Sequence, residues 1–136
     1  MKVELFALCD AATDYQGKLN LLGTFDSIWA KQMPAVHPFC AVALRIRFMK
    51  IEEGEHKVKI SIVDGDGKAV VSPVEAGVNI QFKNTPLSSM ATNMILNLQG
   101  LKFPVYGEYS IDLAIDGRHE VSLPLYVNKI PEQSIN

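Results

Sequence analysis

The chain has 136 residues, which suits one core of ordinary size and is too short for two full domains, so we expect a single domain over residues 1–136. Hydrophobic residues make up 48% and charged residues 21%, a composition that excludes wholesale disorder. The 13 Lys and Arg against 15 Asp and Glu give a net charge of −2. This balance argues against binding of nucleic acid or an anionic membrane through bulk charge.

The N-terminal apolar stretch, residues 5–9, is too short for a signal peptide and ends at Asp10. No apolar run approaches the roughly 18 residues that a membrane-spanning helix needs. We therefore expect a cytoplasmic protein with no membrane association. Cys9 and Cys40 fall inside apolar strand patterns and are predicted to be buried free thiols. A disulfide between them stays open, because their separation in space does not follow from the sequence.

The first predicted element is a long hairpin: residues 3–9 run out, residues 13–17 turn, and residues 18–30 return. Alternation that turns Val3, Leu5 and Ala7 toward the core turns Phe6 and Leu8 outward. The adjacent leucines at 21 and 22 interrupt the alternation just before a glycine. This interruption predicts a β-bulge there.

The next segment, residues 33–38, contains Pro34 and Pro38 and is predicted to be a crossing loop, because proline cannot donate to a sheet ladder. Residues 39–48 alternate more regularly: the even positions are apolar, so Cys40 faces inward and Phe39 faces outward. We expect a strand with one buried face.

Residues 57–62 alternate in the same way and lead into a predicted Asp-Gly hairpin at residues 64–67, with a return strand at 69–72. Residues 87–98 fit both helical and strand spacing. Asn93 and Asn97 are poor helix formers and favour a strand, while a helix stays open. Residues 108–115 and 120–127 form a C-terminal hairpin around Asp116-Gly117.

About nine short strands with frequent turns predict an all-β protein, an antiparallel Greek-key β-sandwich. Residues 101–109 resemble the tyrosine corner of immunoglobulin-like sandwiches, with Tyr109 as its tyrosine, and this feature favours an immunoglobulin-like sandwich. Ile111 stands where antibody domains carry a bridging cysteine, and Trp29 lies on the second strand rather than the third. The chain is therefore not an antibody-type domain, and a jelly roll would give almost the same pattern.

Three stretches, residues 8–12, 17–23 and 107–127, resemble an uncharacterised family of small bacterial single-domain β-sandwich proteins. The resemblance covers nearly the full length, and its motifs are structural. It implies a bacterial cytosolic protein with one domain. It supplies no catalytic or binding residue.

The sequence contains no recognisable catalytic or metal-binding motif. His37, His56 and His119 are spaced too far apart for a metal motif, and we expect them at the surface. The carboxylates of residues 64 and 66 are typical of a turn; a weaker alternative is that they meet Asp10 and Asp14 around a cation. We predict no enzyme activity, no cofactor and no metal.

The most suggestive residues are large apolar side chains predicted on outer faces, which form either local cover or a contact surface. This candidate interaction surface contains Phe6, Leu8, Phe39 and Tyr126. Trp29 is predicted to lie in the core, with a binding role as the alternative. The favoured function is a protein-interaction or self-associating module. The alternative is a small-ligand, carbohydrate or calcium binding module that uses the loops at one end of the sandwich.

Overall fold

The computed structural model of the chain describes residues 1–132, and in this range it contains nine β-strands and one short 3₁₀-helix. The segment at residues 87–98 that was ambiguous in sequence lies almost wholly in a strand, as favoured. The elements are β1 (Lys2–Tyr15), β2 (Lys18–Thr24), β3 (Ser27–Ala30), β4 (Ala35–Met49), η1 (Lys50–Glu52), β5 (Gly54–Val63), β6 (Val74–Ile80), β7 (Ser89–Phe103), β8 (Gly107–Ile115) and β9 (Arg118–Lys129).

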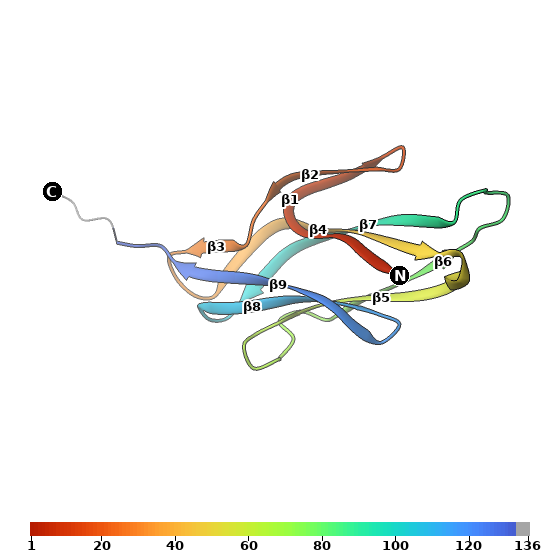
Figure 1. The fold of residues 1–136 in the computed structure, drawn as a ribbon. Coiled ribbons are helices and arrows are strands. Elements are labelled where there is room, and N and C mark those ends of the chain that lie inside the picture. Colours follow the sequence, from red (N-terminus) through yellow and green to blue (C-terminus); the bar gives the residue numbers. More distant parts are fainter. Residues whose placement is uncertain (133–136) are drawn as a thin grey trace.

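The strands form two sheets, shown in Figure 1. Sheet A has the strand order β2-β1-β4-β7, and sheet B has the order β3-β9-β8-β5-β6. Neighbouring strands are antiparallel, apart from β3, which runs parallel to β9. The predicted all-β architecture of about nine strands in two sheets is therefore confirmed, with one parallel pair among the antiparallel ones.

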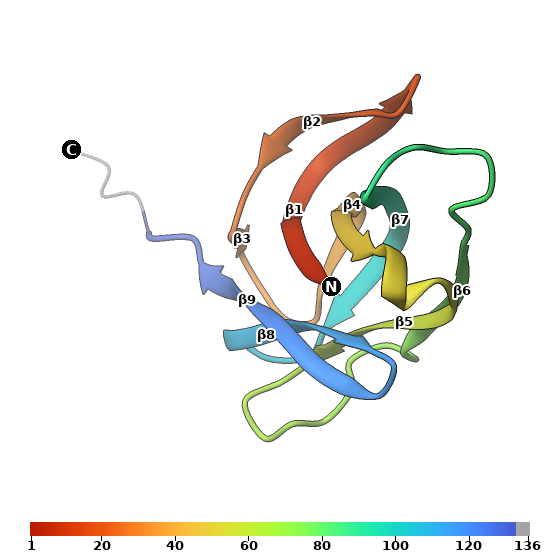
Figure 2. The same ribbon diagram turned by 45° about the vertical axis from the view of Figure 1, so that its right-hand side comes forward.

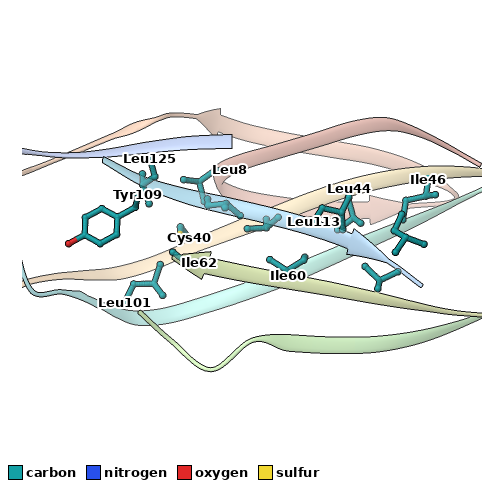
Figure 3. Packing of buried hydrophobic residues seen from close by; sticks show 14 of the residues in the cluster. Leu8, Cys40, Leu44, Ile46, Ile60, Ile62, Leu101, Tyr109, Leu113 and Leu125 are labelled. Atoms are coloured by element: carbon teal, nitrogen blue, oxygen red, sulfur yellow. The ribbon is translucent and has the colours of Figure 1, made fainter. Parts of the chain in front are cut away.

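The main hydrophobic core lies between the two sheets, because each sheet turns one apolar face toward the other. Figure 3 shows side chains from both sheets meeting there. The central strand β4 contributes the inward-facing side chains that the alternation predicted. The fully buried side chains of the two sheets include Val42, Leu44, Ile46, Phe48 and Phe103 of sheet A and Ile111, Leu113 and Leu125 of sheet B.

At two points in sheet A, the alternation of side chains between the two faces of the sheet is offset by one residue. Each point is a cross-strand pair that contains a glycine with positive φ. Gly23 (φ +69°) is opposite Asp10 in the β1–β2 pair, and Gly100 (φ +62°) is opposite Pro38 in the β4–β7 pair. The register continues unchanged on both sides of each point. The side-chain alternation therefore shifts by one residue in both paired strands at the same point. Near Gly23 this gives a bend shared by β1 and β2 instead of the predicted bulge in one strand.

The bend at Asp10 and Gly23 carries the β1–β2 hairpin over the outer side of sheet A, and the curvature of β1 is visible in Figure 2. There it encloses a second, smaller core around Cys9. At the hairpin tip, Asn93 Nδ2 of β7 donates to Asp14 Oδ2 at 3.2 Å and to the Gly17 carbonyl oxygen at 3.1 Å. The side chains of this second core are Cys9, Ala41 and Ala43, with Leu5, Ala12, Leu19, Leu21 and Ile95 packed around them.

Two expectations for this part of the chain are wrong. The β1 register shifts between Val3 and Leu5, so Val3 faces the main core and Leu5 the second core. Phe6 and Leu8 then face the main core instead of the outside, and Leu8 is only 4% exposed. The predicted crossing loop at residues 33–38 is also shorter than expected.

Strand β4 already begins at Ala35 and pairs with β7 on both sides of Pro38. The proline is tolerated because β1 pairs with β4 only from Ala41 onward, which leaves one side of β4 open at Pro38.

The C-terminal Asp-Gly hairpin has the predicted geometry. Asp116 and Gly117 have φ of +53° and +81°, and Ile115 pairs with Arg118 across the turn. The earlier Asp-Gly turn is confirmed only in part. Residues 64–67 do reverse the chain, but the return makes a single bridge, Val63 to Ala69, and the strand beside β5 begins later, at Val74.

Candidate binding surfaces

The four residues predicted to form an interaction surface lie in three different places. Phe6 and Leu8 line an open groove of about 470 Å³ between β1 and β9, so they do not lie on the outer face of sheet A. Phe39 is 42% exposed on sheet A, and Tyr126 is 36% exposed on sheet B. The outward facing of Phe39 and Tyr126 is confirmed. The four side chains nevertheless do not form one continuous surface, because they belong to different faces of the molecule.

Tyr109 has the hydrogen bonds expected of a tyrosine corner. Its hydroxyl donates to the Val105 carbonyl oxygen at 2.6 Å and accepts from the Val105 N–H at 3.4 Å. Its ring packs edge-on against Phe103, with 4.9 Å between ring centroids. These bonds tie the Tyr109 ring to the turn between β7 and β8, which is the geometry expected of a tyrosine corner.

Trp29 is the tryptophan of the chain, and its predicted core position is wrong: it is 57% exposed on β3. Ser27 pairs with Tyr126 and Trp29 pairs with Asn128 in the parallel β3–β9 ladder. Since paired residues of a parallel ladder point to the same side, Trp29 and Tyr126 share the outer face of sheet B. The sequence missed this pair, because it depends on which strand lies beside β3.

An open groove of about 600 Å³ lies on the same face, next to Tyr126. Its floor holds Ser110 and Ser122, which both donate to Asp112 Oδ1 at 2.6 Å, while His119 Nε2 lies 2.7 Å from the Ser122 hydroxyl. The serine therefore stands between the histidine and the carboxylate. In a catalytic triad the histidine stands between the other two, so this arrangement does not activate the serine.

The free edge of β7 is the second candidate surface. Within residues 1–132, β7 is the last strand of sheet A and pairs with β4 only, so alternate backbone N–H and C=O groups along its other side have no strand partner there. The strand is 15 residues long, and residues 89–101 contain no charged residue and no proline. A small apolar cleft of about 90 Å³ opens beside this edge, between Met94 and Leu96 of β7 and Val74 and Ala76 of β6.

The other sheet edges in the described part of the chain carry features that discourage strand pairing. Strand β3 has only 4 residues, and β6 has 7 with Glu75 among them. Strand β2 carries Lys18 and bends at Gly23. The part of β9 that β3 leaves uncovered contains Pro124, which has no N–H to donate. Strand β7 stands apart from these edges in its length of 15 residues and in its uncharged run at residues 89–101, and its own bend at Gly100 lies near the end of that run.

A third cluster surrounds His56, near the N-terminus. Its Nδ1 lies 2.6 Å from Asp116 Oδ2, its Nε2 lies 2.6 Å from the Glu52 carbonyl oxygen, and its ring packs on Phe48. Both partners are acceptors, so both ring nitrogens donate and the imidazolium form is favoured. The hydrogen bond to Asp116, with that to Glu52, raises the pKa of His56. With both nitrogens engaged, His56 is a structural link rather than a free base.

The two cysteines are free and buried, which confirms their prediction as buried thiols. Burial raises the pKa of the Cys9 thiol and raises that of Cys40 to about 11, so neither is poised as a nucleophile. The aspartates considered for a cation site serve their own turns: Asp14 accepts from Gly17, and Asp64 accepts from Asp66 and Lys68. In residues 1–132, no group of three or more His, Cys, Asp or Glu side chains could hold a metal ion.

Comparison with known proteins places the chain in a family. The sequence model of a family of unknown function, DUF6941, matches residues 4–128. No curated protein and no solved structure matches the chain. In the part of the chain that the structure describes, no helix is long and apolar enough to cross a membrane.

Proposed function

The chain belongs to this family of unknown function, and we propose that it acts without catalysis, by pairing the open edge of β7 with the same edge of a second copy. The observation that carries the proposal is the uncharged run at residues 89–101 on an uncovered edge strand. An edge of this length invites pairing with another chain unless charge, proline or a bulge blocks it.

We also infer an immunoglobulin-like strand order. In that fold one sheet contains strands A, B and E and the other contains G, F and C. Here β1-β4-β7 match A, B and E, and β9-β8-β5 match G, F and C. Tyr109 then lies near the start of strand F, where a tyrosine corner belongs. In the constant-type domain a strand D covers the free edge of strand E. In the described part of this chain β7 has no such cover, and the second copy would supply it.

An antiparallel pair of β7 edges fits a two-fold axis perpendicular to the sheet. Such an axis keeps the inner faces of both copies on the same side. Met94, Leu96 and Leu98, which pack against the main core, would then continue that core across the interface. The partner strand would also cover the apolar cleft between β6 and β7.

A second copy suits this edge better than a charged partner does. In a two-fold pairing the residues of β7 meet those of an identical strand, so any charge near the axis would be repelled by its own copy. Residues 89–101 carry none. Self-pairing therefore meets no charge repulsion.

Sedimentation velocity of the whole chain over a range of concentrations tests the proposal. We expect a reversible dimer for the native chain and a monomer for the double variant Asn97→Lys/Gln99→Lys. Both residues are exposed on β7, so the folded monomer tolerates lysine there, while two like charges on each copy oppose pairing.

The matched control is Asn20→Lys/Leu22→Lys, which adds the same charges to exposed positions of β2, the opposite edge of sheet A. This variant is expected to remain dimeric. A native chain that stays monomeric at its highest soluble concentration would contradict the proposal, as would a dimer that the β7 variant leaves intact. Circular dichroism checks that both variants are folded.

A bacterial, cytoplasmic setting belongs to the proposal as well, supported by the sequence features given above. The alternative function, a ligand or calcium module using loops at one end, gains no support from the geometry. Asp14 and Asp64 are engaged in separate turns.

A further inference from the structure

The outer face of sheet B carries exposed aromatic side chains that self-pairing through β7 does not involve. Trp29 on β3 and Tyr126 on β9 are diagonal neighbours on this face, and no other element of the described chain covers them. Tryptophan and tyrosine are enriched among residues that dominate binding energy, since each offers a large rigid surface together with a polar group. Their joint exposure marks this face as a place for a second molecule.

The groove beside Tyr126 has a definite charge. Its lining includes the carboxylates of Asp64 and Glu108, and two lining serines, Ser110 and Ser122, donate to the carboxylate of Asp112 next to the groove. None of the described residues that line it is a lysine or an arginine. Glu108 pairs directly across the ladder with Tyr126, so a carboxylate and an aromatic ring stand side by side. This combination attracts a cation with a planar or apolar surface.

The spacing of the acids selects an organic cation over a metal ion. Among residues 1–132 no three acidic or other ligating side chains converge closely enough to hold a metal. The negative charge is instead spread along the groove, from the turn at Asp64 to the β8–β9 ladder. Two copies of this face would also oppose like charges, which argues against a second copy as the occupant.

We propose that this groove binds an arginine side chain presented by a partner protein. The planar guanidinium stacks on Tyr126 and pairs with Glu108, and Trp29 provides the adjoining apolar contact. Arginine fits better than lysine, because its planar group stacks on aromatic rings and donates two parallel hydrogen bonds to one carboxylate. The proposal is independent of pairing through β7, which lies in the other sheet.

Fluorescence titration of the native chain tests this site, since Trp29 is the single tryptophan and lies on the face in question. The probe is an acetylated, amidated Gly-Arg-Arg-Gly peptide. The same peptide with citrulline in place of arginine keeps the shape and removes the charge. We expect saturable binding of the arginine peptide, weaker binding of its lysine counterpart and none of the citrulline peptide.

Two variants locate the binding. Glu108→Gln removes the charge at an exposed position and is expected to weaken binding about tenfold, the usual cost of losing one charged hydrogen-bond partner. The matched control, Glu120→Gln, alters an exposed carboxylate on β9 that does not line the groove and should leave the affinity unchanged. Tyr126→Leu should also weaken binding, because it removes the stacking surface.

Three results would overturn the proposal. They are no saturable binding of the arginine peptide, equal losses in the Glu108 and Glu120 variants, and equal affinity for the citrulline peptide. A maltotriose titration supplies a further comparison. Saturation by this sugar without binding of the arginine peptide would assign the groove to a carbohydrate instead.

Discussion

A few side chains link separate segments of this sandwich through hydrogen bonds, and His56 is the clearest case. It joins three segments: its own strand β5, the Glu52 carbonyl of η1 and the Asp116 carboxylate of the β8–β9 turn. Only the protonated ring donates to both acceptors. The link therefore depends on pH.

The free energy of unfolding should depend on the protonation states of His56 and Asp116. The raised pKa of His56 means that its contribution is complete below its ordinary value of 6.5 and is lost as pH rises through the folded value. The hydrogen bond from His56 lowers the pKa of Asp116, whose contribution is present above its ordinary value of 3.8 and is lost as pH falls through its folded value.

Asp116→Asn tests this coupling, because asparagine keeps the turn preference and removes the charge. We expect its melting temperature to lie below that of the native chain near about pH 5, with the difference shrinking toward about pH 9 as His56 becomes neutral. Thermal melts across this range give the measurement. A difference that does not change with pH would rule out the charge of His56 as its cause.

The Tyr109 hydroxyl also links two segments, because it bonds to the backbone of the β7–β8 turn. Tyr109→Phe keeps the ring against Phe103 and removes the hydroxyl that donates to Val105. We expect the free energy of unfolding to fall by about 1 kcal/mol. Urea denaturation measures the change, and Tyr15→Phe, at an exposed tyrosine, should leave the midpoint where it was. Equal effects of the two variants would contradict the role of the corner.

At the scale of elements, the bends of sheet A decide which side chains meet. The β1–β2 hairpin reaches the outer side of β4 only because Asp10 and Gly23 change face together. Without that bend, Cys9, Ala41 and Ala43 would lose their cover. The hairpin therefore covers these small residues, and their small side chains allow it to pack close to the sheet.

Gly23→Ala should weaken this bend. A Cβ there would lie 2.6 Å from Asp10 Oδ2, which the carboxylate can relieve by rotating, but the φ of +69° still costs about 1–2 kcal/mol for any residue with a side chain. Gly77→Ala on β6 is the control, since nothing lies within 4 Å of its Cβ. Urea midpoints should fall for the first variant and hold or rise for the second. A loss common to both would exclude the bend as the cause.

For the whole molecule, the features that depend on nearby residues could be predicted from sequence. The alternation of residues 39–48 and the Asp116-Gly117 turn are examples, because strand facing and turn type follow from local chemistry. The facing of Phe6 and Leu8 could not be predicted, since a register shift near Glu4 reverses the pattern.

The candidate surfaces also combine features that can be predicted from nearby residues with features that depend on the arrangement of strands. The uncharged run at residues 89–101 is visible in the sequence, but its place at an edge depends on strand order. The proximity of Trp29 and Tyr126 likewise arises from pairing between strands almost 100 residues apart. The sequence predicted large exposed apolar groups in general, and the arrangement of the sheets selected which of them share a face.

The placement of the two sulfur atoms has a consequence for how the protein can be handled. Cys40 belongs to the core between the sheets and Cys9 to the small core on the other side of sheet A, so the sheet itself separates them. A covalent link would require one side chain to pass through that layer. The native fold therefore forms without a disulfide between them and needs no oxidant to reach it.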